Sequence, residues 1–124
     1  MVSGTPARSS AGIAAPSEAG AAYNRELTAA DKATSFAVFH QDAVKLKALA
    51  RAIADGVRAT RWPAAVQPTA NRFADAIAGD VLYWVDEINA RSWDEANAVS
   101  PTPHNNAAKG AEQMREALGL PSIS

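Results

Sequence analysis

Two histidines are the side chains with the most versatile chemistry near neutral pH in this sequence. They are His40 and His104, and the chain contains no cysteine. If the chain is an antiparallel helical bundle, both would fall in loops at the same end, where Asp42 or an asparagine could join them around a metal ion. The alternative, which we favour, is two exposed imidazoles that hold no metal.

Three carboxylates in the second half of the sequence are candidates for acid–base chemistry. Asp80, Asp86 and Glu87 do not share one helical stripe with an apolar surround, so we expect solvated charges rather than a paired acid and base. The sequence also contains no glycine-rich phosphate loop and no G-x-S-x-G, H-E-x-x-H or EF-hand motif. We therefore predict a non-enzymatic protein with no catalytic residue, no cofactor and no metal ligand.

The tryptophans and Tyr83 are the aromatic residues most able to form a binding surface. Trp84 falls on an apolar seam and is expected in the core, whereas Tyr83 points away from it and lines a groove or lies flat on the surface. Trp62 and Trp93 lie at helix junctions and would cap the two ends of the core. A ligand slot between helices is the alternative, although alanine-rich seams pack too closely for a large cavity. A ligand or partner surface would involve Tyr83, Trp62, Trp93, His40 and His104.

The stretch Trp62–Trp93 is the element around which the other helices are expected to pack. Its apolar residues recur at spacings of three and four, the period of one helix face, for about six turns. Pro68 is expected to begin the helix proper after an irregular first turn at Pro63. Gly79 is expected to allow a neighbouring helix to approach closely; the alternative is a bend in the helix. The apolar face consists of Val66, Ala70, Phe73, Ile77, Val81, Trp84 and Ile88.

Two amphipathic helices are predicted before this stretch. The first begins near Pro16 and ends in a break between Val38 and Gln41. Asp42 is then expected to cap the second helix, which runs from about residue 43 to residue 61. One stripe of the first helix carries Tyr23, Leu27, Ala30, Thr34 and Ala37, and the apolar seam of the second consists of Leu46, Leu49, Ile53 and Val57.

Two more helices are predicted after it. Ser92 and Glu95 form a capping box, which should begin a short helix that ends near Val99. A proline-containing loop follows, and the last helix ends where Gly119 supplies a left-handed cap. The last seam is Ala107, Ala111, Met114 and Leu118. The pattern predicts an all-α protein: an antiparallel four-helix bundle, up-down-up-down, with a short extra helix before the last helix.

Length and charge restrict the classes of protein to which the chain can belong. With 124 residues it is predicted to form a single domain. Its 12 Lys and Arg residues against 13 Asp and Glu residues give no basic excess of the kind that nucleic-acid binding needs. The basic face of the second helix is expected to be solvated; the alternative is a strip that docks an anionic partner. No apolar run reaches the roughly 18 residues of a membrane span.

The first 15 residues differ in composition from the rest of the chain. They are mainly Ser, Gly, Ala and Pro, with almost no large side chains, and such a segment cannot bury enough surface to offset its ordering entropy. Residues 1–15 are therefore predicted to be a flexible tail or tether, and residues 16–121 to be the bundle domain. No signal-peptide pattern is visible at the N-terminus.

Three short motifs carry a family resemblance over roughly residues 20–121. They are A-A-Y-x-x-x-L at Ala21–Leu27, W-P-A-x-V-Q-P at Trp62–Pro68 and R-x-A-L-G-L-P at Arg115–Pro121. With them, the chain resembles small predicted lipoproteins of high-GC Gram-positive bacteria, the actinobacteria. Such chains carry a signal peptide, a lipobox cysteine, a Ser/Gly/Ala-rich tether and an alanine-rich helical domain. The resemblance implies no activity and no catalytic residues, and this chain lacks the lipobox cysteine.

The resemblance predicts the cellular location of the protein and the kind of role it has. We expect a non-enzymatic module of the cell envelope, secreted and lipid-anchored in its full-length form, that binds a protein partner or a small ligand. The membrane would be reached only through that anchor. The alternative is a cytoplasmic or phage-type helical regulatory or accessory protein. The sequence specifies neither the partner nor the oligomeric state.

Overall fold

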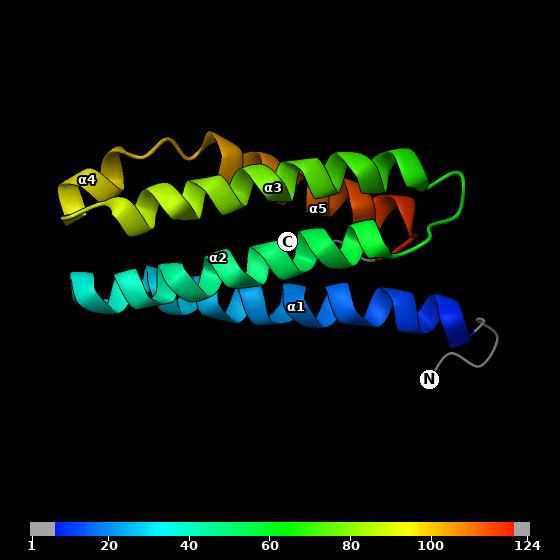
Figure 1. Ribbon diagram of the computed structural model, residues 1–124, viewed down its shortest axis with the longest axis horizontal. Coiled ribbons are helices and arrows are strands. Elements are labelled where there is room, and N and C mark those ends of the chain that lie inside the picture. The colour runs from blue at the N-terminus through cyan, green and yellow to red at the C-terminus, as the bar shows by residue number, and fades with distance from the viewer. Residues whose placement is uncertain (1–6, 121–124) are drawn as a thin grey trace.

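The computed structural model describes the backbone of residues 7–120 and the side chains of residues 18–120. This part of the chain contains five α-helices and no strand: α1 (Ala7–Asp31), α2 (Phe36–Ala59), α3 (Gln67–Asn89), α4 (Trp93–Ala98) and α5 (Thr102–Ala117). Figure 1 shows that consecutive long helices run in opposite directions along the long axis of the molecule, with α4 at the end where α3 finishes. The predicted all-α bundle, with a short extra helix before the last one, is confirmed.

The four long helices pack in chain order. α2 packs against both α1 and α3, and α3 packs in turn against α5. α1 and α5 are therefore the two outer members of the series, and they face each other across the open side of the bundle. None of the described helices is both long enough and apolar enough to cross a bilayer.

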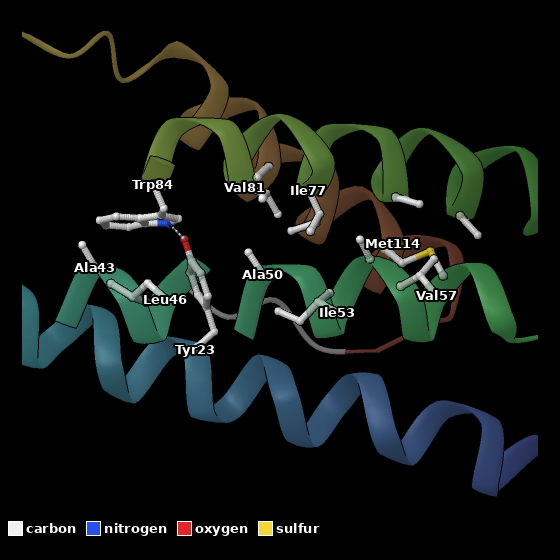
Figure 2. Packing of buried hydrophobic residues seen from close by; sticks show 14 of the residues in the cluster. Tyr23, Ala43, Leu46, Ala50, Ile53, Val57, Ile77, Val81, Trp84 and Met114 are labelled. Carbon is white, nitrogen blue, oxygen red and sulfur yellow. Dashed lines mark hydrogen bonds between the residues drawn. The ribbon is translucent and has the colours of Figure 1, made fainter. Parts of the chain in front are cut away.

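The interface between α2 and α3 forms the dry core. Figure 2 shows Ile77, Val81 and Trp84 of α3 facing Leu46 and Ile53 of α2. The predicted α3 face is confirmed: Phe73 and Ile88 are partly buried, and its other members are buried. Alanines such as Ala50 and Ala70 are fully buried between the helices, where their small size lets the backbones approach.

The predicted break between Val38 and Gln41 is wrong. α2 begins earlier, at Phe36, because the Ser35 side chain caps it by accepting a hydrogen bond from the Val38 amide at 3.2 Å. Asp42, the predicted cap, instead lies inside α2 and is buried. The early start also places aromatic side chains of α2 against the short helix α4.

The predicted turn at the start of α3 is confirmed. Pro63 accepts a hydrogen bond from the Val66 amide at 2.8 Å, and Pro68 lies in the first turn of α3, where its missing amide hydrogen costs nothing. The capping box is also confirmed. Ser92 accepts from the Glu95 amide at 3.2 Å, although the Glu95 carboxylate reaches one residue further back than expected, to the Arg91 amide at 2.8 Å.

The end of α5 has the predicted glycine cap. Gly119 has a φ of 72°, in the left-handed region that glycine tolerates. The Leu120 amide donates to the Arg115 carbonyl at 2.8 Å, and the Gly119 amide donates to the Glu116 carbonyl at 3.1 Å. These two bonds satisfy carbonyls that would otherwise lack partners at the helix end.

Among the glycines of the helices, the one held closely against a neighbouring helix is not the one predicted. A Cβ atom added to Gly79 would meet only Pro103 Cβ, at an ordinary 3.8 Å. A Cβ added to Gly110 would lie 3.1 Å from Phe73 Cδ1 and 3.6 Å from Ala76 Cβ. The prediction for Gly79 is therefore wrong, because it is Gly110 of α5 that packs tightly, against Phe73 and Ala76 of α3.

The N-terminal boundary also differs from the prediction. α1 begins at Ala7, before the expected start at Pro16. Residues 1–6 and the side chains of residues 7–17 lie outside the described part of the chain, as do residues 121–124. The tail at residues 1–15 and the domain limits of 16–121 therefore stay predictions.

Candidate ligand-binding site

Two of the three carboxylates predicted to be solvated are buried. Asp80 is 0% exposed and Glu87 is 5% exposed, so that prediction is wrong for both. Residues 77, 80, 84 and 87 follow one another at helical spacings of three and four, and they mix two acids with Ile77 and Trp84. Asp80 of this stripe bonds to Tyr23 of α1 and to His104 of α5, whereas the predicted apolar face of α3 includes neither Asp80 nor Glu87.

Asp80 accepts hydrogen bonds from three other side chains. The Tyr23 hydroxyl of α1 donates to Asp80 Oδ2 at 2.6 Å, and the Trp84 indole N–H lies 3.2 Å from the same oxygen. On the other side, His104 Nδ1 of α5 lies 2.8 Å from Asp80 Oδ1. A buried carboxylate needs such donors to offset the loss of water. Asp80 therefore connects the two outer helices through α3.

Tyr23 completes the network from α1. Its oxygen accepts the Trp84 N–H at 2.9 Å, and Figure 2 shows this bond between the two side chains. Burial, followed by the negative charge of Asp80, raises the pKa of Tyr23 far above its ordinary value. The hydroxyl therefore stays protonated and remains a donor to Asp80.

His104 is neither in a loop nor fully exposed, so both expectations for it are wrong. It lies in the first turn of α5 and is partly buried. Its ring stacks on Tyr83, with 5.2 Å between ring centroids, and meets Trp84 edge-on at 5.7 Å. Because the Asp80 carboxylate only accepts, Nδ1 carries the proton, and the carboxylate fixes the ring orientation. Among the described residues, none forms a hydrogen bond with Nε2.

A cavity of about 530 Å³ lies between α1 and α5, and α2 and α3 form its floor. The prediction that alanine-rich seams leave no large cavity is therefore wrong. Small residues on both walls leave space there, while the bridge from Tyr23 through Asp80 to His104 ties the outer helices together at one end. The small wall residues are Gly20, Ala21, Ala107, Ala108 and Ala111.

Polar and apolar side chains are distributed unevenly along the cavity. Asp80, His104 and the Tyr23 hydroxyl lie at the end where α5 begins. The cavity extends along α5 as far as Leu118, a helix length of roughly 20 Å. Its large apolar lining residues are Leu27, Ile53, Val57, Trp62, Phe73, Ile77, Met114, Leu118 and Leu120, and further polar ones are Asn24, Glu112 and Arg115.

Two other predicted site residues lie at or beside this cavity. Trp62 is buried in its lining, and its indole N–H donates to the Val57 carbonyl at 2.9 Å. Tyr83 does not point away from Trp84, because the two ring centroids are only 4.8 Å apart. The Tyr83 hydroxyl donates to Glu87 at 3.1 Å, so Tyr83 supports the His104 ring from outside the cavity lining.

The remaining two predicted site residues lie elsewhere. Trp93 begins α4 and packs against Phe36 and Phe39 of α2, at centroid distances of 5.6 and 5.2 Å. His40 lies within α2, not in a loop, and is partly buried. Neither residue lines the cavity, and no group of three or more His, Asp or Glu side chains in the described chain is placed to hold a metal ion.

Comparisons of the chain with protein-family models, with curated proteins and with solved structures found no match. The functional assignment therefore depends on the chemistry of the cavity. Tyr23 and Asp80 were not among the predicted site residues. The signal that could have found Asp80 is its place in a helical stripe with Ile77 and Trp84, which indicates a buried acid.

Proposed function

We propose that this protein binds a small, largely apolar molecule in the cavity between α1 and α5. The observation that carries the proposal is a cavity of about 530 Å³ with a mainly apolar lining and a cluster of Tyr23, Asp80 and His104 at one end. Glu112 and Arg115 are the polar lining residues toward the other end. Ligand sites in proteins are typically clefts of about 300–1,000 Å³ with apolar walls and a few convergent polar groups. Helical bundles commonly build such sites between facing helices.

The packing of the bundle suits this role. The floor of the cavity includes Ile53, Val57 and Ile77, which belong to the α2–α3 core. The walls come from α1 and α5, each of which packs principally against one neighbour. A ligand can therefore enter by a small separation of α1 from α5 while the α2–α3 core stays intact.

Binding is better supported than catalysis. His104 is oriented by a carboxylate, as a general base would be. The described lining, however, contains no Ser, Thr, Cys or Lys side chain that it could activate as a nucleophile. The protein is therefore proposed to be a binding module and not an enzyme.

The cellular location proposed for this module is the bacterial envelope, with a lipid anchor in the full-length protein. Its support is the resemblance of Ala21–Leu27, Trp62–Pro68 and Arg115–Pro121 to predicted lipoproteins. The alternative is a cytoplasmic regulatory or accessory protein. The reading frame distinguishes the two, because a signal peptide with a lipobox cysteine upstream of Met1 supports the envelope and initiation at Met1 contradicts it.

A fluorescence titration tests the binding function. N-phenyl-1-naphthylamine is a neutral apolar probe, and we expect its emission to rise on addition of the protein. Ala111→Phe places a ring in the cavity and should weaken binding by at least about tenfold, or about 1.4 kcal/mol. Ala117→Phe is the matched control, because Ala117 lies on the same helix, is exposed and does not line the cavity.

Two outcomes would contradict the proposal. The first is no binding of the probe, or equal binding by both variants. The second is a dimer in solution that Ala111→Phe dissociates and Ala117→Phe does not. In that case the cavity would be part of a contact between two copies of the chain.

A further inference from the structure

We infer that the ligand is a single-chain amphiphile whose oxygen headgroup, a carboxyl or a hydroxyl, binds His104 Nε2. The inference rests on the proposed function, because it assumes that the cavity binds a small molecule. It adds the chemical class of that molecule and the atom that recognises its polar end.

The shape of the cavity favours a chain-like molecule with one polar end. The cavity follows α5 from His104 to Leu118, which is roughly 20 Å along a helix. Beyond His104, the interior side chains on the α2–α3 floor are apolar, among them Val57, Phe73 and Ile77. An extended alkyl chain can lie along this path with its polar group at His104, whereas a compact polar molecule would leave its own polar groups unpaired.

The hydrogen-bond network around Asp80 leaves one position for a headgroup. Tyr23 donates to Asp80 and accepts from Trp84, and both Asp80 oxygens already accept protein donors. His104 Nδ1 is also occupied, by Asp80. Within the described chain, Nε2 is the ring nitrogen without a hydrogen-bond partner, and it belongs to a side chain that lines the cavity.

The hydrogen-bonding chemistry of His104 Nε2 favours a ligand with an oxygen headgroup over one with a quaternary ammonium headgroup. In the neutral ring Nε2 accepts a hydrogen bond, which a hydroxyl or a protonated carboxyl can donate. In the charged ring it donates, and a carboxylate can accept. A quaternary ammonium offers neither bond, and the Asp80 carboxylate that could attract it is 0% exposed and already has three donors.

Competition among ligands with the same alkyl chain tests the headgroup in the wild-type protein. Bound N-phenyl-1-naphthylamine is displaced with dodecanoic acid, 1-dodecanol or dodecyltrimethylammonium. We expect the acid or the alcohol to displace the probe at a concentration at least about tenfold below that of the ammonium compound. Equal displacement by all three, or tightest binding of the ammonium compound, would overturn the inference.

Two variants of His104 separate recognition from support of the fold. In His104→Asn, the amide nitrogen replaces Nδ1 and can still donate to Asp80, but nothing replaces Nε2. In His104→Gln, the amide reaches the position of Nε2. We expect His104→Asn to weaken the acid and the alcohol by up to about tenfold, and by a larger factor than it weakens the probe. His104→Gln should recover part of the loss.

The outcomes for the inference and for the proposed function differ. If folded His104→Asn, checked by circular dichroism, keeps the wild-type headgroup preference, the inference is wrong while probe binding still supports the cavity. If the wild-type protein does not bind the probe, the proposed function itself fails. If His104→Asn does not fold, the comparison of the three headgroups in the wild-type protein decides the inference alone.

Discussion

The two sides of α3 differ in how they hold the bundle together. Towards α2, α3 presents Val81 and Ala74 to a dry apolar interface. Towards α1 and α5 it presents Asp80, which is held by side chains from both outer helices and lies beside a cavity. One side is close-packed and the other is polar and incompletely filled, although the same helix supplies both. Under the proposed function, the first side serves stability and the second serves binding.

Breaking the polar bridge should have the largest effect on stability. Asp80→Ala leaves the Tyr23 hydroxyl, the Trp84 N–H and His104 Nδ1 without their carboxylate partner. Removal of one member of a buried charged network costs roughly 3–5 kcal/mol, measured by urea unfolding. Asp75→Ala is the control, because Asp75 lies on the same helix and is exposed, and its loss should be below about 1 kcal/mol. Equal losses would show that Asp80 does not hold the outer helices.

Truncation of one leucine in the α2–α3 core and of one leucine at the cavity compares how tightly the two regions are packed. Leu46 is fully buried in the dry core, whereas Leu27 is partly buried and lines the cavity. Leu46→Ala should cost about 3 kcal/mol in unfolding free energy, and Leu27→Ala about 1 kcal/mol, because truncation at an existing cavity removes fewer contacts. Equal losses in urea unfolding would mean that the α1–α5 side is as tightly packed as the core.

The crossing of α3 and α5 should resist even one added methyl group. Gly110→Ala would bring a Cβ to 3.1 Å from Phe73, and overpacking of this kind costs roughly 1–3 kcal/mol. Gly79→Ala is the matched control, because the added Cβ would be at an ordinary van der Waals distance from Pro103. It should stabilise α3 by up to about 1 kcal/mol, since alanine favours the helix more than glycine does. Melting temperatures that move in the same direction for both variants would contradict this assignment.

The smallest effect concerns the dependence of stability on pH. Burial raises the pKa of Glu87 above its ordinary 4.5; the Tyr83 hydrogen bond opposes the shift, and Asp86 adds to it. As pH rises, the Glu87 carboxyl therefore loses its proton at a lower pH in the unfolded chain than in the folded protein. Its contribution to the free energy of unfolding is fully present below the pKa of the unfolded chain, and it is lost as pH rises through the pKa of the folded protein.

Substitution of Glu87 checks this direction. Glu87→Gln should flatten the fall in unfolding free energy between acidic and neutral pH, because the amide has no proton to lose in that range. Asp86→Asn, at an exposed position, is the control and should change the slope less. An unchanged slope in Glu87→Gln would show that another group, such as the Glu26 carboxyl, whose pKa is also raised by burial and then by Asp42, carries the dependence.

The sequence predicted the dry side of the bundle far better than the polar side. A regular apolar spacing such as that of Leu46, Ile53 and Val57 specifies a core without further information. The bridge depends on Tyr23, Asp80 and His104, which are far apart in the sequence and meet only after α1 and α5 have packed. No periodicity encodes that meeting, and the cavity follows from it.

Nuclear magnetic resonance of a few assigned side chains tests the central claim most directly. Trp62 and Met114 line the cavity, whereas Trp93 lies apart from it on α4. On titration with N-phenyl-1-naphthylamine, we predict that the Trp62 indole N–H and the Met114 methyl signals shift together and saturate with one affinity, while the Trp93 indole N–H stays in place. A shift at Trp93 with none at Trp62 or Met114 would contradict a ligand site between α1 and α5.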